Sequence, residues 1–154
     1  MTGTQLSELF ARYGDDVYRF AYSFTRHAAD AEDVCQSVFC RLAEGRTELE
    51  PGKEKAWLLA CAANACKNRF RFLKRWQSLP LEAADVPGGN GREVLEAVLS
   101  LPEKYRAPVH LYYYEGYSQG EIADILGLRL TAVQTRMQRA RAMLKEVLSD
   151  EITL

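Results

Sequence analysis

Two stretches of the sequence carry several basic side chains and no acidic one. The first runs from Lys67 to Arg75 and the second from Arg129 to Lys145, in a chain of 154 residues whose formal net charge is −1. Lysine and arginine neutralise phosphate groups, whereas an ordinary solvent-facing helix usually mixes charges of both signs. Two separate basic segments in a nearly neutral chain therefore indicate contact with nucleic acid at two places, and an acidic surface for another partner.

The second basic stretch follows a pattern typical of a helix-turn-helix. Ser118 and Glu121 have the spacing of a capping box, Gly127 supplies a turn, and apolar residues from Val133 onward mark the inner side of a longer helix. The outer side of that helix carries the polar and basic side-chain types that reach base edges and phosphates in a major groove. We therefore predict DNA contacts from this motif, by Ser118, Arg129, Thr131, Gln134, Thr135, Arg136, Gln138 and Arg139.

The elements that must hold the two basic stretches are all predicted to be helices. Apolar residues recur at steps of three and four from Leu6 to Phe24, as on one side of an amphipathic helix. Asp30 is the predicted N-cap of a second helix, which ends near Gly45. A third helix begins near Trp57 and continues into the first basic stretch, and no segment of the sequence has a strand pattern.

A segment rich in proline and glycine, residues 78–92, separates this half from a second helical half. Residues 103–115 are predicted to form one of its helices, and Pro108 inside it should remove one backbone hydrogen bond and cause a slight bend. The predicted fold class is all-α, with two small helical domains, residues 1–77 and 93–154, joined by a short flexible linker.

Other features of the sequence argue against several classes of protein. No apolar run approaches the roughly 20 residues that span a bilayer, and the N-terminus has no signal-peptide pattern, so we expect a cytoplasmic protein. We find no nucleophile–base pair and no phosphate-binding loop, and the two histidines, His27 and His110, stand isolated in the sequence, so we do not expect an enzyme.

The cysteines form two pairs, with four residues between the members of each pair. This is not a usual zinc-ligand spacing, so we expect small buried side chains. A metal or redox sensor built from both pairs is an alternative, and its residues would be Cys35, Cys40, Cys61 and Cys66.

Three segments, in this order, resemble the extracytoplasmic-function (ECF) group of sigma factors. Asp30 to Phe39 (DAEDVCQSVF) matches that family's D-A-E-D-x-x-Q-x-x-F segment in sigma region 2. Ala56 to Leu59 (AWLL), followed by the first basic stretch, is similar to the family's promoter-melting segment. Leu101 to Arg106 (LPEKYR) and Tyr113 to Ser118 (YYEGYS) are similar to the start of sigma region 4, whose helix-turn-helix follows.

The resemblance implies a subunit that binds core RNA polymerase and lends it promoter specificity, without catalysis of its own and with no cofactor or metal. The helix from Asp30 is similar to the one that docks on the clamp helices of the polymerase largest subunit. Phe39 is then either an anchor on the polymerase or part of the core. The implied core-polymerase contacts are Asp30, Glu32, Asp33, Gln36 and Phe39.

The resemblance also implies a role for each basic stretch. The helix-turn-helix reads the −35 promoter element, and the first basic stretch reads the −10 element and holds the opened strand. Strand opening needs phosphate neutralisation and planes for unstacked bases, which basic residues interleaved with aromatic ones supply. The implied −10 contacts are Asn64, Lys67, Asn68, Arg69, Arg71 and Arg75.

Some positions depart from the family's pattern. Arg129 stands where many members have a serine that caps the recognition helix, although an arginine there can hold a phosphate. Ala60 and Ala63 stand at positions that are often basic. By analogy with the family, an anti-sigma protein that covers these surfaces is a further expected partner. A stand-alone helix-turn-helix regulator is the main alternative, and binding to core polymerase distinguishes the two.

Overall fold

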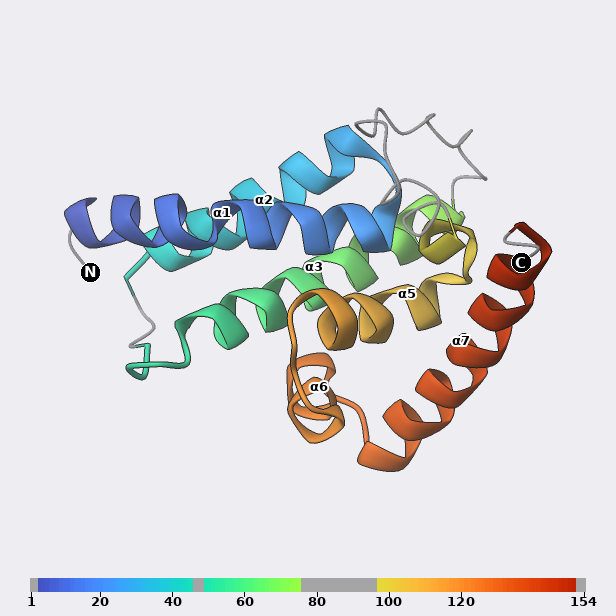
Figure 1. The fold of residues 1–154 in the computed structure, drawn as a ribbon. Helices are drawn as coiled ribbons and strands as arrows, with labels where there is room; N and C mark the ends of the chain where they lie inside the picture. Colours follow the sequence, from blue (N-terminus) through green and yellow to red (C-terminus); the bar gives the residue numbers. More distant parts are fainter. Residues whose placement is uncertain (1–2, 46–48, 76–96, 152–154) are drawn as a thin grey trace. The chain divides into compact units, whose positions relative to one another are not determined.

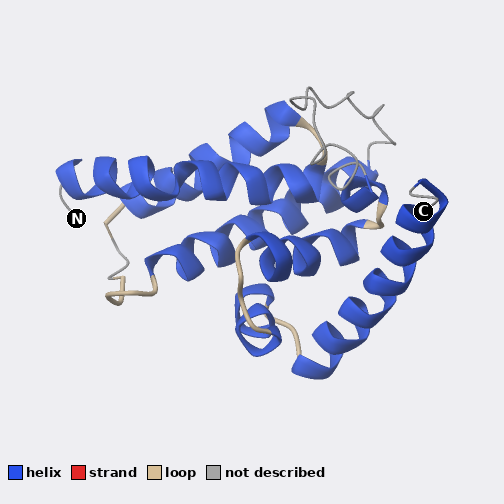
Figure 2. Ribbon diagram, in the orientation of Figure 1, coloured by secondary structure: helices blue, strands red, loops and turns tan. Residues whose placement is uncertain are grey.

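A computed structural model of the chain describes residues 3–45, 49–75 and 97–151, with side chains as far as residue 68 in the first half and residue 146 in the second. Within these ranges the chain is helical and has no strand (Figure 2), which confirms the predicted fold class. The chain divides into two compact units, Met1–Glu82 and Ala83–Leu154. The predicted linker, residues 78–92, lies outside the described residues.

Three helices make up the described part of the first unit: α1 (Gly3–Thr25), α2 (Ala28–Ala43) and α3 (Glu54–Arg75). Each of them packs against the other two, and Figure 1 shows them side by side. α2 and α3 begin at Ala28 and Glu54, a little before the positions that the apolar pattern predicted. The first turn of an amphipathic helix need not be apolar, and alanine or an acidic residue favours a helix there.

The core of the first unit follows the spacing of three and four residues in each helix. One stripe of each helix is fully or almost fully buried, while the opposite side faces solvent. Burial of a leucine or phenylalanine side chain stabilises the fold by about 1.5–3 kcal/mol, so this stripe determines how the three helices pack. The largest contributors are Val17, Phe20, Phe24, Val34, Val38, Leu42, Leu58 and Leu59.

The second unit contains α5 (Glu103–Val109), the π-helix η1 (His110–Tyr114), α6 (Gln119–Leu126) and α7 (Leu130–Glu151). α5 and α6 both pack against α7. Their shared core consists of side chains with little or no exposed surface, chiefly Tyr105, Leu111, Ile122, Ile125, Val133, Met137 and Ala140. The long helix α7 is thereby held on two sides.

Pro108 changes the type of the helix that contains it. The bend predicted at this residue takes the form of a wider turn, because the α-helix gives way to η1 directly after Val109. The Glu115 backbone N–H donates to the His110 carbonyl at 3.1 Å, five residues back, as in a π-helix. Gly116, with φ of 78°, then ends the segment.

Arg106 fastens the beginning of α5. Its side chain is only 6% exposed, and its Nη1 donates to the Leu101 carbonyl at 2.7 Å. A buried guanidinium is stable only when it is hydrogen-bonded. The arginine of the LPEKYR segment therefore supports the fold and does not face a partner.

Candidate nucleic-acid interface

The helix-turn-helix begins with the predicted capping box. The Glu121 N–H donates to Ser118 Oγ at 3.2 Å, and the Ser118 N–H donates to Glu121 Oε1 at 3.0 Å. The first bond satisfies an amide that the helix itself leaves without a partner, and the second holds the preceding backbone. The hydrogen bond from Ser118 lowers the pKa of the Glu121 carboxyl below its usual value. This part of the sequence prediction is confirmed.

Gly127 forms the turn between α6 and α7 in the left-handed conformation, with φ of 66° and ψ of 36°. A side chain at this φ is strained, whereas glycine adopts it freely. After the turn, Val133, Met137 and Ala140 face inward and have no exposed surface. These three residues fix which side of α7 points away from the core.

The outward side of α7, together with Arg129 directly before it, carries most of the side chains predicted to contact DNA. Arg136 is partly exposed, and the rest are exposed: Arg129, Thr131, Gln134, Thr135, Gln138 and Arg139. Thr135 Oγ1 donates to the Thr131 carbonyl at 2.9 Å, so this hydroxyl has an internal partner in the free protein. Ser118 is exposed but is engaged in the capping box. The structure thus brings all the predicted residues except Ser118 together on or beside one helix.

Arg141, which also belongs to the basic stretch, has a different role. Its Nε donates to Tyr113 Oη at 3.1 Å, and its guanidinium lies 5.3 Å from the centre of the Tyr112 ring. The hydrogen bond to Tyr113 raises the pKa of the arginine further. Arg141 therefore ties α7 to η1.

Two residues beside α7 were missed by the sequence prediction. Lys104 and Tyr105, at the start of α5, line one open concavity of about 600 Å³ together with Arg129, Arg136 and Arg139. No local pattern identifies them, because they precede α7 in the sequence by more than twenty residues and meet it only through packing.

In the first unit, the residues of α2 that were predicted to contact the polymerase separate into an exposed and a buried set. Glu32, Asp33 and Gln36 are exposed. Asp30 and Phe39, which we also predicted to contact the polymerase, are only 6% exposed each. The Phe39 ring lies edge-to-face against Phe10 at 5.1 Å. The sequence left two roles open for Phe39, an anchor on the polymerase or a part of the core, and in the structure it is part of the core.

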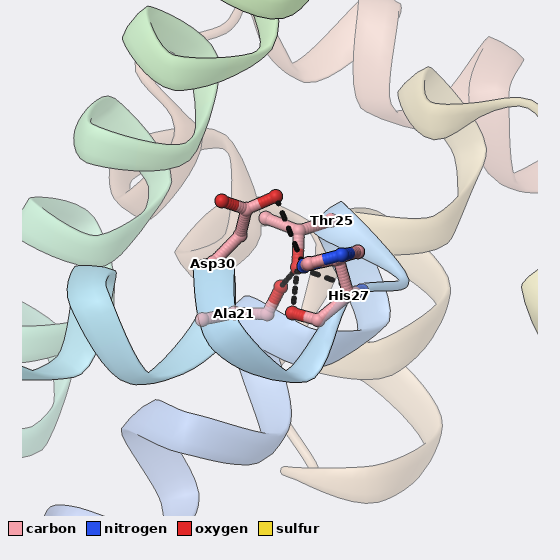
Figure 3. A network of polar contacts seen from close by, with 4 residues as sticks. All are labelled: Ala21, Thr25, His27 and Asp30. Carbon is pink, nitrogen blue, oxygen red and sulfur yellow. Dashed lines mark hydrogen bonds and ion pairs between the residues drawn. The ribbon is translucent and has the colours of Figure 1, made fainter. Parts of the chain in front are cut away.

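Asp30 is not the N-cap of α2, contrary to the prediction. His27 occupies that position, with extended backbone angles and no side-chain cap. Figure 3 shows the contacts at the turn between α1 and α2, where Thr25 Oγ1 accepts from the His27 N–H at 3.3 Å and donates to the Ala21 carbonyl at 2.9 Å. These two bonds close the turn before Asp30, so the helix starts earlier than predicted. Asp30 then faces back, with Oδ2 at 3.4 Å from His27 Nδ1.

The residues predicted to contact the −10 element lie on α3. Asn64 and Asn68 are exposed and Lys67 is partly exposed. The backbone of α3 continues to Arg75, but the side chains of Arg69, Arg71 and Arg75 lie outside the described residues. Asn64 and Asn68 are four residues apart and therefore share one side of the helix.

The cysteines only partly match the prediction of buried side chains. Cys35 and Cys66 are buried, Cys61 is partly exposed and Cys40 is exposed, and all four are free thiols. Burial raises the pKa of the Cys35 and Cys61 thiols, which lowers their thiolate fraction. Among the described residues, no three histidine, cysteine or acidic side chains gather as a metal site.

The histidines are less isolated than the sequence suggested. His27 lies beside Asp30, and His110 Nε2 lies 3.8 Å from Glu115 Oε1 while its ring stacks on Tyr114.

No helix in the described ranges is long and apolar enough to cross a membrane.

Comparison with known proteins accounts for both halves of this arrangement. Residues 9–76 match the Sigma-70 region 2 family and residues 91–144 match the Sigma-70, region 4 family. The chain is 30% identical to the RNA polymerase sigma factor CarQ of Myxococcus xanthus, over 93% of this chain and 88% of CarQ. It is 32% identical to the ECF RNA polymerase sigma factor SigE of Mycolicibacterium smegmatis, over 92% of this chain. The chain belongs to the ECF sigma factors of the sigma-70 family.

The lengths of these sigma factors differ. The chain covers 61% of SigE, so it spans less than two thirds of that relative. The fold is also found in the solved structure of the sigma factor RpoE in complex with the anti-sigma factor NepR from Bartonella quintana. That comparison has a TM-score of 0.77 and 22% identity, and covers 94% of this chain and 97% of the other.

The two matched regions of this sigma factor contain all the predicted contact residues. Region 2 contains the exposed set on α2 and the −10 candidates on α3, and region 4 contains the helix-turn-helix. The main alternative from the sequence, a regulator that uses only the helix-turn-helix, leaves the region 2 match without a role.

Proposed function

We propose that this sigma factor binds core RNA polymerase through α2, reads the −10 element through α3 and reads the −35 element through α7, and so directs promoter-specific initiation. It acts in the cytoplasm, where the polymerase and the DNA are, and supplies specificity without catalysing a reaction. The observation that carries the proposal is the presence, in one chain, of an exposed acidic set in sigma region 2 and an exposed basic helix in sigma region 4.

The polymerase contact is assigned to Glu32, Asp33 and Gln36. The opposite side of α2 is occupied by the core residues Val34 and Val38, each 2% exposed, so these three polar side chains point away from α1 and α3. Two carboxylates and an amide on one helix side can accept hydrogen bonds from basic residues of a partner. Asp30 and Phe39 contribute indirectly, by holding α2 in place.

The −10 contact is assigned first to Asn64 and Asn68, whose side chains are exposed on one side of α3. Asparagine can both donate and accept, which suits the edges of unpaired bases. Lys67 and the basic residues after it would neutralise the adjacent phosphates. Arg69, Arg71 and Arg75 are included in this proposal on the sequence alone.

The −35 contact is assigned to the exposed side of α7. Gln134 and Gln138 are four residues apart and present amides, which can bond to adenine, while Arg129 and Arg139 can bond to guanine or phosphate. The capping box and Gly127 keep α6 at a fixed angle to α7, so that the outer side of α7 remains accessible to a major groove.

The decisive test is binding of the purified chain to bacterial core RNA polymerase, measured by size-exclusion chromatography. Asp33→Arg and Gln36→Ala should weaken the complex, because each removes an acceptor at the assigned surface. Glu44→Arg is the matched control, since Glu44 is exposed at the other end of the same helix and receives the same change of charge. A folded wild-type chain that does not bind core polymerase would contradict the proposal.

The promoter contacts can be tested once the complex is formed. Selection from a random duplex library with the assembled holoenzyme should yield two conserved elements. Gln134→Ala should relax the preference at one position of the upstream element by about 1–3 kcal/mol. Asn64→Ala should act on the downstream element only.

An anti-sigma partner is also part of the proposal. The exposed sets on α2 and α7 would both have to be covered for full inhibition. A protein that holds the chain inactive should therefore protect the backbone amides of α2 and α7 from hydrogen exchange, and leave core polymerase unable to bind.

A further inference from the structure

The concavity beside α7 has an unusually uniform charge. It is open, has a volume of about 600 Å³ and lies between the start of α5 and the N-terminal half of α7. The residues that line it are all described, and none of them is acidic. Its basic side chains come from three parts of the unit: Lys104 from α5, Arg129 from the turn, and Arg136 and Arg139 from α7.

Tyr105 lies beside two of these cations. Its side chain is only 4% exposed, so its position is fixed by packing. Burial by itself would raise the pKa of the Tyr105 phenol, but hydrogen bonds from Arg139 and Lys104 outweigh it and lower that pKa. The Lys104 ammonium also lies 5.1 Å from the centre of the Tyr105 ring. Lys104, Tyr105 and Arg139 line the same concavity, so both positive side chains lie beside a ring whose position is fixed by packing.

Arg136 adds a third fixed cation at the same edge. Its Nη1 donates to the Lys104 carbonyl at 3.5 Å. Like charges brought together repel, and the repulsion is relieved when an anion enters between them. Three positive side chains held around one open concavity therefore favour a ligand with negative charge and several acceptor oxygens, as a phosphate has.

The position of the concavity indicates which phosphate it meets. An α-helix with its side chains is about 10–12 Å wide, close to the roughly 12 Å width of the major groove. A helix lying in the groove therefore has a phosphate backbone along its flank. The inward side of α7 is marked by Val133 and Met137, and the concavity opens on one flank, beside Ala132 and Thr135.

We propose that Lys104, Tyr105 and Arg139 form a clamp for a DNA backbone phosphate next to the −35 element, in which Lys104 and Arg139 bind the phosphate and Tyr105 positions them. This inference rests on the proposed function, because it requires α7 to lie in the major groove. It adds two residues of α5 to the DNA interface, outside the helix-turn-helix itself. A phosphate contact carries no sequence information, so the clamp sets affinity and register rather than base preference.

The experiment uses holoenzyme assembled from the full chain and two fluorescent duplexes. One duplex carries an upstream element selected by the wild-type chain, and the other is a scrambled sequence of the same composition. Affinity is measured by anisotropy over a series of salt concentrations. The variants are Lys104→Gln and Tyr105→Phe, and Lys53→Gln is the control because Lys53 is 75% exposed in the other unit and pairs with Glu50.

Lys104→Gln should weaken binding to both duplexes by the same factor, and the slope of log affinity against log salt should become less steep by about 0.9. Tyr105→Phe keeps the buried ring and removes the hydroxyl, so it should weaken binding to both duplexes by about three- to tenfold. Lys53→Gln should change neither the affinity nor the slope. Thermal unfolding of each variant verifies that the fold is retained.

Three results would overturn the clamp. An unchanged salt slope in Lys104→Gln would mean that this lysine meets no phosphate. A loss limited to the selected duplex would mean that Lys104 reads bases. Wild-type affinity in a folded Tyr105→Phe variant would remove the positioning role of the phenol. Failure of the wild-type holoenzyme to bind either duplex would instead contradict the proposed function, so the two failures are distinguishable.

Discussion

The guanidinium of Arg136 on α7 donates to the backbone carbonyl of Lys104 on α5, at 3.5 Å. In a regular α-helix this carbonyl would accept from the N–H four residues later, but that residue is Pro108, which has none. A proline in α5 therefore frees an acceptor, and an arginine of the recognition helix uses it. The bond is long, yet it links α7, to which the −35 contacts are assigned in the proposed function, to α5, which carries Lys104.

A double-mutant cycle tests this link. Arg136→Ala should destabilise the wild-type chain more than it destabilises a chain that already carries Pro108→Ala. In the Pro108→Ala background, the N–H of residue 108 is restored and donates to the Lys104 carbonyl, so the loss of Arg136 matters less. The difference should be about 0.5 kcal/mol, the lower range for a hydrogen bond near solvent. Chemical denaturation of the four proteins measures it. Equal effects of Arg136→Ala in both backgrounds would show that the two residues are not coupled.

Asp30 and Asp33 should behave differently although they are neighbours on α2. Asp30→Ala removes a buried carboxylate that lies 3.4 Å from His27 Nδ1, and should lower the free energy of unfolding by about 1–3 kcal/mol. Asp33→Ala changes an exposed residue and should lower it by about 0.5 kcal/mol or less.

Binding to core polymerase should rank the same two variants in the opposite order. At a temperature where both variants are folded, Asp33→Ala should lose more affinity for core polymerase. Asp33 belongs to the surface assigned to the polymerase contact, whereas Asp30 is buried. Denaturation curves and size-exclusion binding on the same preparations give both values. A larger binding defect in Asp30→Ala would assign it a direct contact after all.

The helix-turn-helix was predictable from the sequence because its determinants are local. Ser118 and Glu121 are three residues apart, Gly127 forms the turn by its own backbone preference, and Val133 and Met137 follow the helical period. None of these features depends on a distant part of the chain. For the same reason, the helical fold class followed from the apolar spacing alone.

What the sequence did not indicate depends on contacts between distant residues. The local sequence predicts a cap and a docking residue at Asp30, but Thr25 closes the preceding turn and Asp30 is buried beside His27. Phe39 meets Phe10 of another helix, which no local pattern specifies. Tyr105 likewise lines the concavity beside α7 together with Arg139, a residue far along the chain.

The capping box should make part of the stability depend on pH. Hydrogen bonds from Ser118 hold the pKa of the Glu121 carboxyl below its ordinary value of 4.5 in the folded chain. The charged form is therefore favoured by folding. The charged Glu121 carboxylate contributes fully to stability at pH values above its pKa in the unfolded chain. This contribution is lost as the pH falls through the lower pKa that the carboxyl has in the folded chain.

Glu121→Gln isolates this contribution, because glutamine can form the same bond without the charge. Wild type should be the more stable of the two near neutral pH, and the difference should shrink as the pH falls below about 4.5. All other titrating groups are common to both proteins and drop out of the comparison. Thermal unfolding at a series of pH values provides the measurement. A difference that persists undiminished at about pH 3 would contradict the assigned origin.

Arg129 precedes the first residue of α7, and its carbonyl accepts from the N–H groups of Ala132 and Val133 at 3.0 and 3.2 Å. This is the position of an N-cap, where serine is preferred and arginine supplies no acceptor. Arg129→Ser should therefore stabilise the second unit by about 1 kcal/mol relative to Arg129→Ala. Both variants lose the same charge from the concavity beside α7.

DNA binding should not follow stability in this pair. Holoenzymes with Arg129→Ser and Arg129→Ala should bind the selected duplex equally, both more weakly than wild type, with a salt slope less steep by about 0.9. Thermal unfolding and anisotropy, measured on the same samples, separate the two effects. If Arg129→Ser instead bound as tightly as wild type, the cap and not the charge would be what this position provides. The expected result, two variants that differ in stability but bind DNA equally weakly, would mean that residue 129 supplies its charge for contact with phosphate and that its cap affects stability alone.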